Sequence, residues 1–255
     1  MNKLEILFNN KQSDILSIYF TGGYPNLDDT SNIITELEKS KVDLIEIGIP
    51  FSDPVADGPV IQYSNSASIE NGMNLKLLLD QLGKVKNESK IRKILMGYFN
   101  PILQLGVEDF CRACNEVGVD GVIVPDLPLM EYELKYGAIF RQFGIHFIFL
   151  VSPQTSEIRL QEIDQLSTCF IYAVSTNSTT GGAVDFSAQK DYFSRLKKNL
   201  KNPFLIGFGV KDKETFKSAC EYANGAIIGS SFIQAISESG ELNSQIRQFI
   251  QGIKN

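Results

Sequence analysis

Eight short apolar runs, separated by longer amphipathic segments, constrain the fold of this 255-residue chain more than any other feature. The runs are rich in Ile, Val, Phe and Tyr, and most of them are hydrophobic at successive positions. Such continuous hydrophobicity is typical of strands that are buried on both faces of a parallel sheet. The eight predicted strands are residues 15–20, 42–49, 93–99, 121–126, 146–152, 169–175, 203–209 and 225–230.

The segments between these runs have the apolar spacing of roughly 3.6 residues that amphipathic helices show. Clear examples are residues 28–41, 74–86, 107–118 and 211–223. Strands and helices that alternate without a linker predict an α/β fold in which residues 1–255 form a single (β/α)8 TIM-barrel domain. We also expect an extra N-terminal helix and a short extra helix after the eighth strand. A doubly wound open sheet is the alternative, but no Rossmann glycine pattern follows the first strand.

Composition excludes several classes of function. Hydrophobic residues make up 43% of the chain and charged residues 21%, so a core can form without metals or disulfides. The net charge of −6 argues against a nucleic-acid surface, which needs an excess of Lys and Arg. The sequence has neither an apolar run of about 18 residues nor the apolar core of a signal peptide. We therefore expect a cytoplasmic protein that binds neither membrane nor nucleic acid.

Cysteine and histidine are too sparse for nucleophilic or metal chemistry. Cys111, Cys114, Cys169 and Cys220 are scattered and read as reduced structural thiols. The one histidine, His146, lies in an apolar run, which disfavours a Ser-His-Asp or Cys-His arrangement. Acid-base chemistry must therefore be performed by carboxylates, Lys or Tyr.

A carboxylate lies inside the second predicted strand. Glu46 is flanked by Ile45 and Ile47, and burial of an unpaired carboxylate costs several kcal/mol or raises its pKa. Such a residue is either functional or salt-bridged for structural reasons, and the sequence leaves both open. The loop that follows carries Asp53 and Asp57 among prolines and glycines, where Asp is as often a turn former as a functional group.

The loops after the last two predicted strands suit a phosphate group. Residues 207–210 and 228–231 are rich in glycine, and a short helix is expected to begin at Ser230 or Ser231. Backbone N–H groups at such a helix start bind anions, and these loops often form a phosphate site in TIM barrels. The glycines of residues 175–186 suit either a closing lid or a disordered surface loop. The residues alone thus predict a barrel enzyme for a small phosphorylated substrate that uses carboxylates and no metal.

Residues 44–62, LIEIGIPFSDPVADGPVIQ, resemble the tryptophan synthase α-subunit family almost letter for letter. The similarity continues in family order through the rest of the chain. It includes GGYP, MGYFNPI, GVDGVIVPDLP, FIYAVSTNSTTG, GFGV and IGSS. The resemblance implies a carbon-carbon lyase of tryptophan biosynthesis. Its expected reaction is the retro-aldol cleavage of indole-3-glycerol phosphate into indole and glyceraldehyde 3-phosphate.

The resemblance also implies residue roles. Glu46 is the expected proton donor and acceptor, and Asp57 the carboxylate that stays ionised and accepts a hydrogen bond from the indole N–H. Thr180 is expected to act in loop closure, although the nearby Thr176 and Ser178 depart from the residues that many members carry. The remaining expected site residues are Tyr172 as a catalytic group lining the site, Gly181, Gly209, Gly229 and Ser230 for the substrate phosphate, and Tyr19, Met96, Tyr98 and Leu127 for the indole pocket.

Partners and cofactors follow from the same resemblance. It implies a β subunit that carries pyridoxal phosphate, an αββα heterotetramer, and no cofactor or metal in this subunit. Residues 50–59 and 99–102 are plausible contact surfaces for the β subunit, or ordinary turns. Two alternatives remain: a non-catalytic regulatory partner of a β subunit, or another phosphosugar-handling TIM-barrel enzyme. A barrel that forms indole-glycerol phosphate would carry catalytic Lys residues at its strand ends, and the predicted strands end without any.

Overall fold

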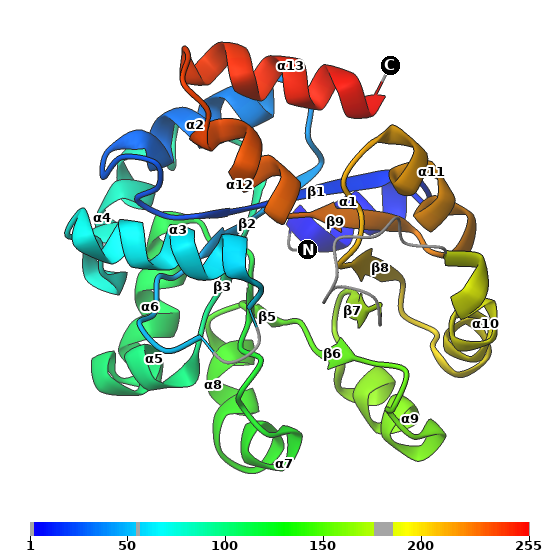
Figure 1. Cartoon of the computed structure of the whole chain (residues 1–255). Coiled ribbons are helices and arrows are strands. Elements are labelled where there is room, and N and C mark those ends of the chain that lie inside the picture. The colour runs from blue at the N-terminus through cyan, green and yellow to red at the C-terminus, as the bar shows by residue number, and fades with distance from the viewer. Residues whose placement is uncertain (1–2, 55–56, 176–185, 255) are drawn as a thin grey trace.

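A computed structural model of the chain describes residues 3–54, 57–175 and 186–254. Their strands form one parallel sheet in the order β5-β4-β3-β2-β1-β9-β8-β7-β6 (Figure 1). The strands are β1 (Ile15–Thr21), β2 (Leu44–Gly48), β3 (Arg92–Met96), β4 (Gly121–Ile123), β5 (His146–Phe147), β6 (Leu150–Val151), β7 (Ile171–Val174), β8 (Phe204–Gly207) and β9 (Gly225–Ile228).

The two ends of this strand order belong to one stretch of chain, because β5 and β6 are the two halves of the fifth predicted strand. The Ile148 N–H donates to the Val122 carbonyl of β4 at 2.8 Å. On the opposite side, the Tyr172 N–H of β7 donates to the Phe149 carbonyl at 2.9 Å. The sheet therefore closes on itself through residues 146–151, and the predicted eight-segment TIM barrel is confirmed.

Helices surround the barrel on the outside (Figure 1), and the four helices predicted from their spacing are present as α2, α4, α6 and α11. The expected extra helices are α1 at the N-terminus and α12 after the last strand. The helices are α1 (Lys3–Asn10), α2 (Asp29–Lys39), α3 (Pro59–Glu70), α4 (Leu75–Val85), α5 (Phe99–Leu105), α6 (Val107–Val117), α7 (Leu129–Glu131), which continues through a π-helical turn (Tyr132–Tyr136) into α8 (Gly137–Gln142), α9 (Glu157–Leu166), α10 (Lys190–Asn199), α11 (Lys213–Tyr222), α12 (Ser230–Ser237) and α13 (Leu242–Lys254).

Two strands, the third and the fourth, end three residues earlier than their hydrophobicity predicts. The third ends at Met96, because α5 begins at Phe99 within the same apolar run. The Asp126 carboxylate fixes this helix start, since both of its oxygens accept from the Phe99 N–H, at 2.9 and 3.1 Å. The fourth strand ends at Ile123, and the turn that supplies Asp126 follows it. Hydrophobicity alone does not distinguish a strand from the apolar first turn of the next helix.

Helix α1 packs against one end of the barrel interior. Its Leu4, Leu7 and Phe8 belong to the same buried cluster as Ile15 of β1, and the Phe8 ring stacks on Phe170 with 5.1 Å between centroids. These contacts lie where the strands begin. A separate and larger apolar cluster fills the space between the sheet and the surrounding helices. The opposite end of the interior, where the strands finish, contains polar side chains, among them Glu46, Tyr19 and Tyr172.

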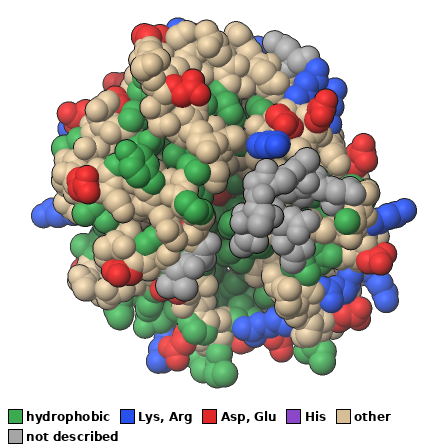
Figure 2. Space-filling view, in the orientation of Figure 1, with side chains coloured by type: hydrophobic (Ala, Val, Ile, Leu, Met, Phe, Trp, Pro, Cys, Tyr) green, Lys and Arg blue, Asp and Glu red, His purple; other side chains and the backbone are tan. Residues whose placement is uncertain are grey.

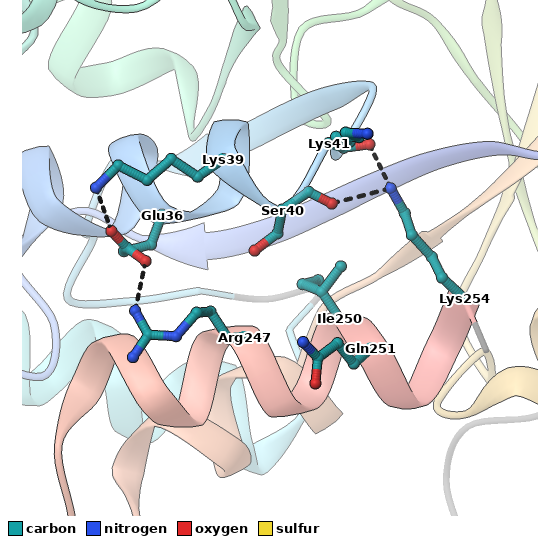
Figure 3. Close-up of a pocket in the computed structure, with 8 residues that line it drawn as sticks. All are labelled: Glu36, Lys39, Ser40, Lys41, Arg247, Ile250, Gln251 and Lys254. Carbon is teal, nitrogen blue, oxygen red and sulfur yellow. Dashed lines mark hydrogen bonds and ion pairs between the residues drawn. The ribbon is translucent and has the colours of Figure 1, made fainter.

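An ion-pair network fastens the C-terminal helix α13 to α2 (Figure 3). The buried Glu36 accepts from Lys39 at 2.6 Å and, through its other oxygen, from Arg247 at 3.0 Å. Lys254 donates to the backbone carbonyls of Ser40 and Lys41, which follow α2 directly. The hollow between the helices, about 360 Å³, is lined by Glu36, Lys39, Ser40, Lys41, Arg247, Ile250, Gln251 and Lys254. Because Lys39 and Arg247 contact Glu36 and Lys254 contacts backbone carbonyls, we assign this hollow a structural role.

Candidate active site

Glu46 lies in the middle of β2, in register with Tyr19 of β1 and Ile94 of β3. Its side chain is fully buried. One carboxylate oxygen, Oε1, accepts a hydrogen bond of 2.9 Å from the Ser17 hydroxyl. The other, Oε2, is buried and has no hydrogen-bond partner among the described residues. An unpaired buried oxygen is costly, which favours a functional explanation for this carboxyl.

Burial raises the pKa of Glu46 from 4.5 to about 8, and the hydrogen bond from Ser17 partly opposes this shift. Near neutral pH the carboxyl is therefore mostly protonated, yet it can release its proton. Within the described part of the chain Glu46 makes no ion pair, so the structural salt bridge that the sequence left open is not present there. A group that titrates close to pH 7 is suited to general acid-base catalysis.

Asp57 lies on the loop between β2 and α3. Its Oδ2 accepts a long hydrogen bond of 3.4 Å from Asn65 of α3, and its backbone carbonyl accepts one of 2.8 Å from Gln62. Burial raises the pKa of Asp57 above its usual 3.8, and the hydrogen bond from Asn65 works in the opposite direction. The loop therefore holds this carboxyl in less contact with water than its Pro- and Gly-rich sequence indicated.

Two buried tyrosines lie close to both carboxyl groups. Burial is the main reason why the pKa of Tyr19 is raised, and the charges of Asp57 and Glu46 add to it. The pKa of Tyr172 is likewise raised by burial first and then by Glu46, Tyr19 and Asp57. Such coupling falls with distance, so the four side chains share one region of the barrel mouth.

Glycines on the neighbouring strands make room for these rings. A Cβ at Gly48 of β2 would overlap the Tyr19 hydroxyl, and a Cβ at Gly207 of β8 would overlap the Tyr172 hydroxyl. Gly229 lies at the other side of Tyr19, where a Cβ would be 3.4 Å from the ring. Each tyrosine therefore fits against backbone, because the adjacent strand has no side chain at that position.

The expected indole-pocket residues fall into two groups. Met96 packs against the apolar interior of the barrel at the end of β3, and Tyr98 is buried and stacks on Phe51 with 4.9 Å between ring centroids. Leu127, in contrast, packs in the outer cluster between sheet and helices, and the structure does not bring it to the tyrosines. β4 has already ended at Ile123, and it is Ile123 that faces the interior.

The loops of the expected phosphate site end two adjacent strands, β8 and β9. Gly209 has a φ of 77°, a backbone conformation that favours glycine. Gly229 is the residue before α12, which begins at Ser230, and the Ser231 hydroxyl is buried without a partner among the described residues. Backbone N–H groups at the start of α12 therefore lie beside Tyr19. Gly181 and Thr180 lie outside the described residues.

Several residues of this region are not among those that the sequence analysis singled out. Phe208 stands edge-on to Tyr172 with 6.3 Å between centroids, and it adopts a φ of 69°, which is unusual for a residue other than glycine. Ile61 of α3 also packs against the interior cluster. Phe208 could have been suspected from its place between Gly207 and Gly209. Ser17 could have been suspected from its position two residues before Tyr19, on the same face of β1.

Thiols and histidine lie apart from this region. All four cysteines are free, and burial raises the pKa of Cys111 to about 12. His146 contacts Thr168 at 2.6 Å and lies 3.5 Å from Glu5 of α1, at the end of the barrel where the strands begin.

Among residues 3–54, 57–175 and 186–254, no group of His, Cys, Asp and Glu is arranged to hold a metal ion. In the same ranges no helix is long and apolar enough to cross a membrane.

Proton transfer is the chemistry that Glu46, Asp57 and the tyrosines can perform together. They lie at the ends of parallel barrel strands, beside a helix start that can bind an anion. These features are those of a TIM-barrel enzyme whose buried carboxyl groups are suited to acid-base catalysis.

Comparison with known proteins gives the family. The family model described as tryptophan synthase alpha chain matches residues 7–254. The alpha chain of Flavobacterium johnsoniae is 53% identical over 94% of this chain and 95% of its own, and that of Bacteroides thetaiotaomicron is 48% identical over the full length of both. The chain belongs to the tryptophan synthase alpha chain family. It is thus a lyase subunit, and the reaction of this family is the cleavage of indole-3-glycerol phosphate into indole and glyceraldehyde 3-phosphate.

Solved structures agree with this assignment. The tryptophan synthase subunit alpha of Legionella pneumophila has a TM-score of 0.92 and 30% identity, covering 99% of this chain and 97% of that one. A chain from the tryptophan synthase complex of Pyrococcus furiosus has a TM-score of 0.87 and 33% identity, covering 95% of this chain and 98% of that one. Their similarity spans the whole barrel.

Proposed function

We propose that Glu46 is the group that moves protons in this lyase reaction and that Asp57 stabilises the charge on the indole ring. The observation that carries the proposal is the buried Oε2 of Glu46, which lacks a partner on a carboxyl whose pKa is about 8. A carboxyl that is protonated near pH 7 can give a proton to carbon and then accept one from a hydroxyl.

The proposed reaction begins when Glu46 protonates C3 of the indole ring. This places a positive charge on the ring nitrogen, whose N–H donates a hydrogen bond to Asp57. The Glu46 carboxylate then takes the proton of the adjacent chain hydroxyl. As the bond between C3 and the glycerol chain breaks, its electron pair returns to the ring, and the chain carbon becomes an aldehyde. Glu46 ends the cycle protonated again, so no external acid or base is consumed.

Burial of Asp57 has a direct consequence for this scheme. A carboxylate in a partly dehydrated loop interacts more strongly with a cationic ring than one in water does. The raised pKa of Asp57 shows that its ionised form is disfavoured without a partner. The positive charge that develops on the indole nitrogen would supply that partner.

We further propose that the substrate phosphate binds at the start of α12. Its ligands would be backbone N–H groups of Gly209, Gly229 and Ser230, together with Gly181, and Thr180 would act in loop closure. The positive end of the α12 dipole favours an anion at this place. For the indole ring we propose contacts with Tyr19, Tyr172, Met96 and Tyr98, and we substitute Ile123 for Leu127 because it faces the barrel interior.

Replacement of Glu46 by Gln tests the proposal directly. Gln keeps the shape of the side chain but cannot exchange a proton, so we expect indole release by the isolated chain to fall by roughly 1,000-fold or more. Glu88→Gln, a change at an exposed position, is the matched control and should act like the original protein. Indole formation is followed by absorbance or fluorescence, and substrate-phosphate binding by calorimetry. Near-normal indole release from Glu46→Gln would refute the role assigned to Glu46.

We also propose that the chain works with a β subunit that carries pyridoxal phosphate, in an αββα heterotetramer. Support comes from the Pyrococcus furiosus neighbour, which is part of a complex, and from exposed apolar side chains. Leu103 of α5 is 51% exposed and Met130 of α7 is 67% exposed. Figure 2 shows hydrophobic side chains at the lower left and at the bottom of the view, where Figure 1 places α5 and α7 respectively. Location in the cytoplasm, a single domain and the lack of a cofactor in this subunit stay predictions.

A further inference from the structure

We propose that Ser17 is a positioning residue for the lyase reaction, because its hydroxyl holds one oxygen of Glu46 and leaves the other to exchange protons with the substrate. The inference rests on the proposed role of Glu46. In this role Ser17 touches neither the substrate nor the reacting atoms. It acts through the Glu46 carboxyl that it holds.

The contact is a consequence of strand register. On β1, Tyr19 lies opposite Glu46, and Ser17 lies opposite Leu44, one side-chain step closer to the start of the strand. Side chains two residues apart on a strand point to the same face, so Ser17 and Tyr19 both flank Glu46 inside the barrel. Ser17 is fully buried, and its Oγ donates to Glu46 Oε1 at 2.9 Å.

This hydrogen bond makes the two oxygens of the carboxyl unequal. Oε1 is occupied by Ser17, whereas Oε2 is the buried atom without a partner among the described residues. A proton delivered from Oε2 and later accepted at Oε2 requires no rotation of the carboxyl between the two steps. The hydroxyl also stabilises the charged form of Glu46 and so lowers a pKa that burial raises.

The other groups around Glu46 do not duplicate this role. Tyr19 approaches from β1, Tyr172 from β7 and Asp57 from the loop after β2. Both tyrosines have raised pKa values and are neutral near pH 7, and a charged Asp57 disfavours a second negative charge. Ser17 is the group among the described residues that donates to this carboxyl and favours its ionised form.

Three substitutions separate the hydroxyl from the volume of the side chain. Ser17→Ala removes the donor, Ser17→Thr keeps it, and Ser17→Val has nearly the shape of Thr without the hydroxyl. Loss of a hydrogen bond to a charged group should lower kcat about 10-fold, with KM changed less than about 3-fold. Because the protonated acid starts the reaction and its pKa would rise, the alkaline limb of the kcat profile should move up by about one pH unit.

The expected result is that Ala and Val show both effects and that Thr resembles the original protein. Ser68→Ala is the control, since this buried hydroxyl also loses one hydrogen bond, to the Gly22 carbonyl, without contacting Glu46. It should leave the alkaline limb unchanged. The midpoint of Glu46 ionisation, read from the infrared carboxyl band after subtraction of the Glu46→Gln spectrum, should move by the same amount in Ala and Val.

Two outcomes would overturn the inference. An alkaline limb and infrared midpoint of Ser17→Ala that match the original protein would show that the hydroxyl does not tune Glu46. Equal losses in Thr and Val would show that packing, and not the hydroxyl, determines the effect. Neither outcome touches the proposed function, which fails on a different result, namely indole release by Glu46→Gln. If the Ala variant does not fold, the comparison of Thr with Val decides the question.

Discussion

At the scale of single residues, the two carboxyl groups of the candidate site, Glu46 and Asp57, differ in how far the fold removes them from water. Glu46 is fully buried on a strand and has one oxygen bound to Ser17. Asp57 lies on a loop and is partly exposed, and among the described residues its carboxylate accepts one long hydrogen bond, from Asn65. The strand carboxyl is therefore expected to exchange protons near neutrality, and the loop carboxyl to respond to charge on the substrate.

Replacement of Asp57 by Asn should lower kcat by about 100-fold or more and change KM much less, because Asn cannot neutralise a positive ring. Steady-state kinetics of indole release by the isolated chain measure both constants. Asp53→Asn is the matched control, since Asp53 lies on the same loop, is exposed and accepts from Ser52. Similar kinetics for the two variants would remove the charge-stabilising role from Asp57.

The raised pKa of Glu46 also makes a prediction about folding. Its pKa is about 8 in the folded chain and 4.5 as a free side chain, so between these values the folded state binds more protons than the unfolded state. The free energy of unfolding should therefore fall as pH rises from about 5 to about 8, by up to about 1.4 kcal/mol per pH unit from this group. Chemical denaturation at several pH values measures the slope.

Glu46→Gln is the reference for that measurement, because Gln remains neutral at every pH. The original protein and the variant should have similar stability near pH 5, and the variant should be the more stable of the two above pH 8. Two curves that stay parallel from pH 5 to pH 9 would contradict the raised pKa.

At the scale of elements, each end of the barrel is completed by a different helix. Helix α1 packs apolar side chains where the strands begin, and α12 begins where the last strand finishes. The apolar end contributes packing energy, and the opposite end contributes backbone donors and polar side chains. Stability and catalysis are thus assigned to opposite ends of the same sheet, as is general for this fold.

Phe8→Ala should lower the free energy of unfolding by about 3 kcal/mol, because the ring is buried and stacks on Phe170. Ile6→Ala, on the exposed side of the same helix, should cost less than about 1 kcal/mol. Denaturant unfolding compares the two, and kcat measured well below the melting temperature should be near normal in both. Equal destabilisation by the two substitutions would mean that α1 does not close the barrel interior.

At the scale of the whole molecule, one face of the barrel combines the candidate site with exposed apolar side chains. A single exposed Leu is ordinary, but Leu103 and Met130 follow β3 and β4, the strands whose ends also carry Met96 and Ile123. A partner docked there would lie next to the mouth of the barrel.

Leu103→Asp should weaken binding to a β subunit about 10-fold or more and leave indole release by the isolated chain unchanged. Ile158→Asp is the control, because Ile158 of α9 is 73% exposed on another part of the barrel. Sedimentation or calorimetric titration with the β subunit of the same organism measures the affinity. Equal affinity of both variants would place the interface elsewhere.

Hydrophobic periodicity and strand alternation predicted the barrel, its helices and the buried position of Glu46. These features depend on neighbours in sequence, so a sequence carries them. The contact of Ser17 with Glu46 joins residues 29 positions apart and depends on the register of two strands, which no local pattern encodes. The family resemblance assigns Leu127 to the indole pocket, and the sequence alone does not reveal that β4 ends at Ile123, before Leu127.

The division of the fifth strand bears on how the closed sheet opens. β5 and β6 each pair with their neighbour through two residues, whereas β1 and β2 are paired through five. Among the strands, amide hydrogen exchange should therefore be fastest along residues 146–151 and slowest in the β1–β2–β3 region. Residues 146–151 thus form the most weakly paired part of the barrel, a seam. This seam lies across the sheet from the strands that carry Glu46 and Ser17. If β5 and β6 separated transiently from their neighbours, β1 and β2, which carry Ser17 and Glu46, would remain hydrogen-bonded to each other.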